Sequence, residues 1–182
     1  MFSMAARRIL QLGDPLLREI SVPAEAAESE AIFADLRDTL HEFQRGHGFG
    51  RGISAVQIGE LKRLIYIEIG GKTYKLRNPE YEFQSGEKFT LWDDCFSFPD
   101  LLVWLERHER VRVRYEDENG AAQIIDASDA FSELLQHEID HLDGILAVDR
   151  VTDIKTLCTR EEFEKRYRQS SPYAVAPATI ES

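Results

Sequence analysis

The strongest signal in the sequence is His137-Glu138-Ile139-Asp140-His141, which indicates a chemistry and lies at the centre of the expected fold. On a helix, residues four apart lie on one face, so His137 and His141 would point the same way. Two imidazoles placed like this can bind one divalent metal ion, and the glutamate between them can reach a water molecule beside it. The motif lies inside residues 127–143, an amphipathic segment that predicts a helix. Two surface histidines among scattered acids are the alternative interpretation.

The segments around this helix predict further helices and a set of strands. Residues 25–45 place apolar side chains at helical spacing, and Asp14-Pro15 is typical of a helix start. Another helix is expected over residues 160–170. Turn residues such as Gly70-Gly71 and Asn119-Gly120 separate short runs with strand character. The expected strands are residues 63–69, 72–76, 88–92, 101–105, 110–115 and 121–126.

The order of these elements predicts the fold class. A helix, several antiparallel strands and then helices is typical of an α+β domain. The chain has 182 residues, of which 43% are hydrophobic and 30% charged, as is usual for a globular protein. A chain of this size buries enough apolar surface to fold without disulfide bonds. We expect one domain over residues 1–170 and a flexible tail over residues 171–182.

The charge and the apolar pattern exclude several classes of partner. The formal net charge is −11, whereas nucleic-acid binders are usually basic, so no direct nucleic acid binding is expected. This charge does not argue against a transient ribosome contact through one local patch. No stretch reaches the roughly 18 apolar residues of a membrane helix, and no signal peptide is evident. With only Cys95 and Cys158, we expect a cytoplasmic protein with free thiols and no membrane contact.

Two histidines need a third ligand to hold a catalytic metal ion, and three possibilities can be weighed. The extended HExxHxxGxxH pattern is excluded, because its last position is Ala147. A downstream glutamate is available at Glu161, Glu162 or Glu164. Cys95 is the third possibility, since thiolate binds zinc or ferrous iron well, although a lone cysteine is more often a small buried hydrophobe. The residues alone leave the last two possibilities open.

Residues 50–59, GRGISAVQIG, contain a second group of candidates. Glycine permits close approach of the backbone to a ligand, so Gly52 is a candidate substrate-binding residue. Gln57 supplies an amide donor that can hydrogen-bond a developing oxyanion. A plain structural turn and a dinucleotide-binding loop are the alternatives. A helical pattern precedes this segment, however, where the dinucleotide fingerprint requires a strand.

Three segments together resemble the peptide deformylase family. That family carries G-x-G-x-A-A-x-Q, then E-G-C-L-S, then Q-H-E-x-D-H. Here the segments are residues 50–57, 93–97 and 136–141, in the same order along the chain. The resemblance spans roughly residues 7–155. The third motif is nearly complete, the first is good and the second is degraded.

The resemblance implies antiparallel β-strands packed around the helix that carries the HExxH motif. It implies that Cys95, His137 and His141 bind one divalent metal ion, with Fe(II) expected and Zn(II) or Ni(II) possible in its place. The reaction that it implies is removal of the formyl group from N-formyl peptides, in particular from the N-terminal methionine of new polypeptides.

The resemblance also implies roles for residues around the metal ion. Glu138 would take a proton from water and pass it to the leaving amine. Gln57 and the backbone N–H of Phe96 would hold the tetrahedral oxyanion. These roles require Glu138, Gln57 and Phe96 to lie beside the three metal ligands.

Five of the residues that depart from the family pattern bear on the candidate site. Asp93 stands in place of glutamate, Asp94 in place of glycine, and Leu102 where many members have an arginine that contacts the peptide. Arg51 replaces a usually apolar residue, and Glu133 lies four residues before the first histidine of the motif, on the metal face of the helix. We expect Arg51 and Glu133 to line the substrate pocket and to pair there, the alternative being that both face water.

Three other functions remain open at this point. One is a deformylase-like hydrolase with an altered substrate. Another is an HExxH metalloprotease that uses a downstream glutamate and not Cys95. The last is a non-catalytic relative that binds a metal ion or a partner without turnover.

Overall fold

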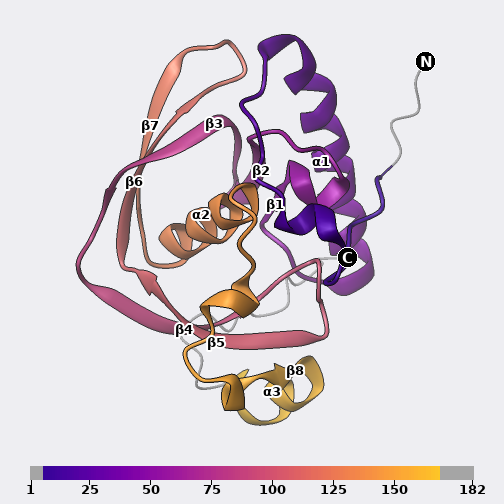
Figure 1. The fold of residues 1–182 in the computed structure, drawn as a ribbon, viewed down its shortest axis with the longest axis vertical. Helices are drawn as coiled ribbons and strands as arrows, with labels where there is room; N and C mark the ends of the chain where they lie inside the picture. The colour runs from indigo at the N-terminus through magenta and orange to yellow at the C-terminus, as the bar shows by residue number, and fades with distance from the viewer. Residues whose placement is uncertain (1–5, 169–182) are drawn as a thin grey trace.

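The computed structural model describes residues 6–168, and the tail expected over residues 171–182 lies outside them. Within the described range, the chain forms two antiparallel sheets with helices packed against them, in agreement with the α+β class (Figure 1). The α-helices are Ala26–His47 (α1), Asp129–Leu142 (α2) and Arg160–Arg166 (α3). The 3-10 helices are Pro15–Arg18 (η1), Ala55–Ile58 (η2), Ala147–Arg150 (η3) and Ile154–Thr156 (η4). No helix among residues 6–168 is long and apolar enough to cross a membrane.

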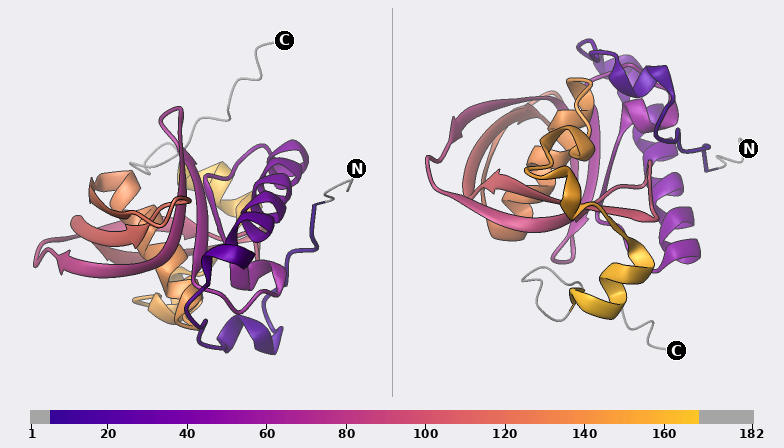
Figure 2. Two further views of the ribbon diagram at one scale, coloured as in Figure 1. Left: turned by 90° about the horizontal axis from the view of Figure 1, so that it is seen from above. Right: turned by 60° about the horizontal axis from the view of Figure 1, so that its bottom comes forward.

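The two sheets border α2 from different sides (Figures 1 and 2). The larger sheet has the order β1-β2-β3-β6-β7, and its neighbouring strands are antiparallel. Its strands are Gly52–Ser54 (β1), Leu64–Ile69 (β2), Lys72–Gln84 (β3), Arg110–Glu116 (β6) and Ala122–Ser128 (β7). The smaller sheet has the order β4-β5-β8. Its strands are Lys88–Asp94 (β4), Leu101–His108 (β5) and Cys158–Thr159 (β8).

Strand β2 is buried on both faces, which explains its almost unbroken apolar sequence. Successive side chains of a strand point to opposite faces of the sheet. Leu64 and Tyr66 therefore belong to the apolar cluster under α1. Ile65 and Ile67 belong to a second cluster, which includes the apolar side chains of α2. At β2 the larger sheet is therefore covered by α1 on one face and by α2 on the other.

The structure differs from the sequence-based expectation mainly in β3. That strand was expected over residues 72–76 but continues to Gln84. Its pairing with β6 shifts register between Arg77 and Glu80, where Asn78 has a positive φ of 53°. Such an irregularity interrupts the alternation by which a strand is recognised. The short strands β1 and β8 were not predicted either.

A buried guanidinium joins α2 to the smaller sheet. Arg107 of β5 is only 2% exposed and forms ion pairs with Asp93 of β4 and Asp140 of α2. The Nη2 atom of Arg107 lies 2.9 Å from a carboxylate oxygen of Asp93. Arg150, in η3, pairs with Asp140 from the other side. Buried charges are tolerated only when they are paired, and both terminal nitrogens of Arg107 contact a carboxylate.

Replacing Arg107 with methionine should destabilise the fold strongly. The change leaves the carboxylates of Asp93 and Asp140 buried without the guanidinium, and breaking a buried ion pair typically costs about 3–5 kcal/mol. The free energy of unfolding should be measured by urea denaturation at pH 7 with metal ions chelated, so that ion binding does not contribute.

Arg112→Met is the matched control for this prediction. Arg112 pairs with Asp126 across β6 and β7 at 2.7 Å, and both side chains are about half exposed or more. Exposed pairs contribute about 0–1 kcal/mol, so the control should unfold almost as the parent does. Equal losses in the two variants would contradict the role assigned to Arg107.

Candidate active site

Three side chains of the kinds that bind divalent metals converge at one point. Cys95 follows the end of β4, while His137 and His141 lie on consecutive turns of α2. The Cys95 sulfur lies 3.2 Å from Nε2 of His141, which in turn lies 3.2 Å from Nε2 of His137. All three ligand atoms lie within 4.8 Å of one another, and all three residues are buried. The structure thus brings together the predicted ligands.

The spacing of these atoms fits a tetrahedral ion. With about 2.3 Å to sulfur and about 2.0–2.1 Å to nitrogen, tetrahedral coordination separates the two nitrogens by about 3.3 Å and sulfur from nitrogen by about 3.6 Å. The observed separations between ligand atoms are close to these values. Three ligands also leave a fourth position for water or substrate, as in catalytic sites.

Asp93 orients the first histidine. The Nδ1 atom of His137 lies 2.9 Å from Oδ1 of Asp93, so this nitrogen donates to the carboxylate and Nε2 is left free to bind a cation. Burial would raise the pKa of Asp93, but the ion pairs with His137 and Arg107 outweigh burial and lower the pKa below its usual range. The shorter aspartate therefore makes the contact through which such carboxylates orient metal-binding histidines.

Glu138 faces the same pocket from α2. Burial raises the pKa of Glu138 to about 7, although the charge of His137 and the hydroxyl of Ser54 oppose this shift. The Ser54 hydroxyl donates to the Glu138 carboxylate. A Cβ atom at Gly52 would lie 2.9 Å from Oε1 of Glu138, so glycine leaves the room that this carboxylate occupies. A carboxylate whose pKa lies near neutrality can both accept and release a proton.

Gln57 presents its amide to the cysteine side of the site. Its Oε1 atom accepts from the backbone N–H of Ser54 at 3.0 Å, which fixes the orientation of the amide. The Nε2 atom then points toward Ser97 Oγ at 3.3 Å and Cys95 Sγ at 3.5 Å. These distances are long for hydrogen bonds, and the amide donor faces the group of metal ligands.

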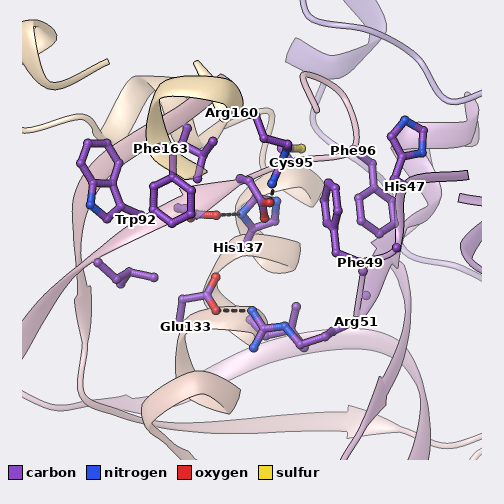
Figure 3. A pocket seen from close by; sticks show the side chains of 18 of the residues that line it. His47, Phe49, Arg51, Trp92, Cys95, Phe96, Glu133, His137, Arg160 and Phe163 are labelled. Atoms are coloured by element: carbon purple, nitrogen blue, oxygen red, sulfur yellow. Dashed lines mark hydrogen bonds and ion pairs between the residues drawn. The ribbon is translucent and has the colours of Figure 1, made fainter. Parts of the chain in front are cut away.

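A cavity of about 410 Å³ opens in front of these residues (Figure 3). Phe96, Phe49 and His47 form an aromatic wall on one side of the cavity. Phe96 stacks on Phe43 at a ring-centroid distance of 3.8 Å. A Cβ atom at Gly50 would lie 2.5 Å from the ring of Phe96, and φ at this glycine is 129°, so no other residue fits there without strain.

The residues that depart from the family pattern also line this cavity. Arg51 and Glu133 pair with an N–O distance of 2.7 Å, as the sequence suggested. Asp94 ends β4 without a positive φ, so its position does not require glycine. It pairs with Arg160, whose guanidinium lies 4.0 Å from the ring centroid of Phe49. Leu102 is buried on β5, where it pairs with Cys158 of β8.

The alternative third ligands lie apart from the histidines. Glu161 and Glu162 form ion pairs with Lys165 and Arg166 of their own helix, α3, and Glu164 of that helix pairs with Arg168 beyond its end. Among residues 6–168, the group that joins both histidines to a third ligand contains Cys95 and none of these glutamates. The geometry therefore favours cysteine.

Sequence reasoning missed Arg107, Ser54 and Arg160. A signal for Arg107 existed, because it continues the apolar face of Val103 and Leu105 two residues beyond the strand expected over residues 101–105, and an arginine on an apolar face needs acidic partners. Ser54 stands where the family pattern has alanine, which marks it only once the motif is recognised. For Arg160 we find no signal in the sequence, since its partners Asp94 and Phe49 lie far away along the chain.

Comparison with known proteins indicates the same family as the sequence motifs do. The family model for polypeptide deformylase matches residues 6–157. The peptide deformylase of Bartonella tribocorum is 34% identical over 177 residues, which cover 92% of this chain and 97% of that protein. The peptide deformylase of Heliobacterium modesticaldum is 39% identical over 150 residues, which cover 81% of this chain and 95% of that protein.

Solved structures of peptide deformylases share the fold. The enzyme of Synechococcus elongatus, crystallised with actinonin, superimposes with a TM-score of 0.78 at 30% identity, covering 97% of this chain and 93% of that one. The enzyme of Thermotoga maritima gives a TM-score of 0.76 at 27% identity and covers 81% and 99% of the two chains. By sequence, fold and the convergence of its HExxH helix with Cys95, this chain belongs to the peptide deformylase family of hydrolases.

Proposed function

We propose that this chain hydrolyses the N-formyl amide of peptides, with the formylmethionyl N-terminus of new polypeptides as the substrate that family membership favours. The observation that carries the proposal is the convergence of Cys95, His137 and His141 beside Glu138 on one cavity. Together they supply ligands for a divalent ion and a carboxylate beside it, which is the combination that metal-assisted amide hydrolysis uses. The cavity is open to a peptide on one side and bounded by buried polar groups on the other.

Cys95, His137 and His141 would hold the metal ion, and one sulfur with two nitrogens suits Fe(II), Zn(II) or Ni(II). When bound, the ion supplies Lewis acidity toward a water molecule and the formyl carbonyl. We take Fe(II) as the expected ion and the other two as replacements. Asp93 and Arg107 keep His137 oriented for this purpose.

Glu138 and Gln57 carry the proton transfer and the charge stabilisation. Glu138 accepts a proton from the attacking water and gives it to the amine as the carbon–nitrogen bond breaks, so that formate and a free N-terminus are the products. The Gln57 amide and the backbone N–H of Phe96 donate to the oxygen that gains negative charge. Ser54 holds the Glu138 carboxylate toward the cavity.

Cys95→Ser should lose most of the bound metal ion, because a hydroxyl is a far poorer ligand than a thiolate. Metal content per chain, measured by mass spectrometry after gel filtration, tests this. Cys158→Ser is the matched control and should keep its ion, because Cys158 lies on β8 outside the group of ligands. Retention of metal by Cys95→Ser would instead favour a metalloprotease that uses a glutamate of α3.

Glu138→Ala should keep the metal ion and lose most of its hydrolysis of formyl peptides. The ligands stay in place while the general base is removed, a loss that typically slows turnover by about 100- to 10,000-fold. Formate release from a formylmethionyl tripeptide measures the rate, and metal content is measured alongside. Glu106→Ala, at an exposed position of β5, serves as the control with unchanged turnover.

Two results would count against this assignment of Glu138. One is near-normal turnover in Glu138→Ala, and the other is loss of its metal ion. Absence of turnover in the parent protein on every formyl peptide tested would favour a non-catalytic relative.

A further inference from the structure

Two opposite charges form part of the cavity wall beside the candidate metal ligands. Glu133 lies one helical turn before His137 on α2, and Arg51 precedes β1 in the glycine-rich segment. Their side chains meet at one wall of the cavity, with Nη2 of Arg51 2.7 Å from Oε2 of Glu133 (Figure 3). A second guanidinium nitrogen of Arg51 lies 3.3 Å from the backbone carbonyl of Ala130.

Fold stability does not account for this pair. The Glu133 side chain is only 4% exposed, and its ligand atoms lie within 4.8 Å of those of Asp93 and His137, so a second carboxylate is close by. Apolar side chains of similar volume usually stabilise a fold as much as a buried ion pair does, or more. Removing either partner alone is unfavourable, because it leaves the other charge buried.

The position of the pair matches the place where the first side chain of a formyl peptide must lie. The β-carbon of that residue is three bonds from the formyl carbon, hence within about 4 Å of it. If the formyl group reacts beside His137 and Glu138, this side chain enters the part of the cavity next to them. A carboxylate oxygen of Glu133 lies within 4.8 Å of a ring nitrogen of His137, so the ion pair is within reach.

The exposed part of the pair determines which side chains it can accept. Arg51 is 29% exposed and offers N–H donors to the cavity, beside the acceptor oxygens of Glu133. A neutral amide or hydroxyl side chain can match a donor and an acceptor at once. A carboxylate would meet Glu133 and Asp93, an ammonium would meet Arg51, and an aliphatic chain would desolvate the exposed part of the Arg51 guanidinium without replacing its contacts with water.

We propose that the Arg51–Glu133 pair sets the side-chain specificity of this site, favouring N-formyl substrates whose first residue is neutral and polar, with an amide or hydroxyl group, over those with an aliphatic first residue. The inference rests on the proposed deformylation. It names the class of the first residue and makes a formylated residue other than methionine the better substrate.

The test compares two first residues of nearly equal length and shape. Formyl-Gln-Ala-Ser and formyl-norleucyl-Ala-Ser differ mainly in the polar amide, and formyl-Ala-Ala-Ser serves as the short reference. With Fe(II)-loaded protein prepared without oxygen, we expect kcat/KM for the glutamine peptide to exceed that for the norleucine peptide by at least about tenfold. Binding of the same uncleaved peptides to Glu138→Ala, measured by calorimetry, should rank them in the same order.

Arg51→Ile combined with Glu133→Ile should reverse the preference and raise kcat/KM on formylmethionyl peptides by at least about tenfold. Each single change should lower the thermal midpoint below that of the double variant, because it leaves one buried charge unpaired. Arg114→Ile combined with Glu80→Ile is the matched control. These two residues pair at the same 2.7 Å on the exposed side of β3 and β6, so the ranking of substrates should not change.

The outcomes separate this inference from the proposed function. Turnover with norleucine or alanine preferred over glutamine overturns the inference and leaves deformylation standing. So does an unchanged ranking in the Arg51→Ile, Glu133→Ile variant. Absence of both turnover and binding for every formyl peptide overturns the two together. If the double variant does not fold, the order of peptide turnover by the parent protein and of peptide binding by Glu138→Ala still tests the inference.

Discussion

The Arg107 guanidinium lies between the carboxylates of Asp93 and Asp140, almost entirely out of water. Asp93 stands two residues before Cys95 and also holds His137, while Asp140 directly precedes His141. One buried cation therefore joins the strand end that supplies sulfur to the helix that supplies two nitrogens. Because an unpaired buried charge is so unfavourable, this network permits little displacement of β4 relative to α2. The relative positions of the three candidate metal ligands, Cys95, His137 and His141, depend on this network.

The reaction chemistry and the side-chain recognition that we propose use neighbouring turns of α2. The turn with His137, Glu138 and His141 matches the family motif, whereas the preceding turn brings Glu133 into the cavity. Arg51 directly precedes β1, a strand that packs against α2, and balances the charge of Glu133. A family that shares one hydrolytic centre can thus differ in the wall of the pocket, because the wall is built from residues that are not needed to hold the metal ion.

The long elements were predictable from the sequence, and the short or irregular ones were not. Helices α1 and α2 follow an apolar repeat over several turns, and glycine at the turns marks the hairpins. Strand β1 has three residues and β8 has two, too few for an alternation to be recognised. The second half of β3 contains a positive φ at Asn78 and two register shifts, so its side chains do not alternate regularly.

From the sequence alone, His137 and His141 can be placed on one helix face with Glu138 between them in the chain, because residues four apart on a helix align whatever the rest of the chain does. On residue chemistry alone, the sequence left both Cys95 and the glutamates of α3 open as candidates for the third ligand. It also left Arg51 and Glu133 either paired or facing water. Only the tertiary structure decided these points, together with the contacts of Arg107 and Ser54. Each of these contacts joins side chains that are distant in the sequence. Such contacts depend on how the sheets pack on α2, and no repeat of residues along the chain predicts that packing.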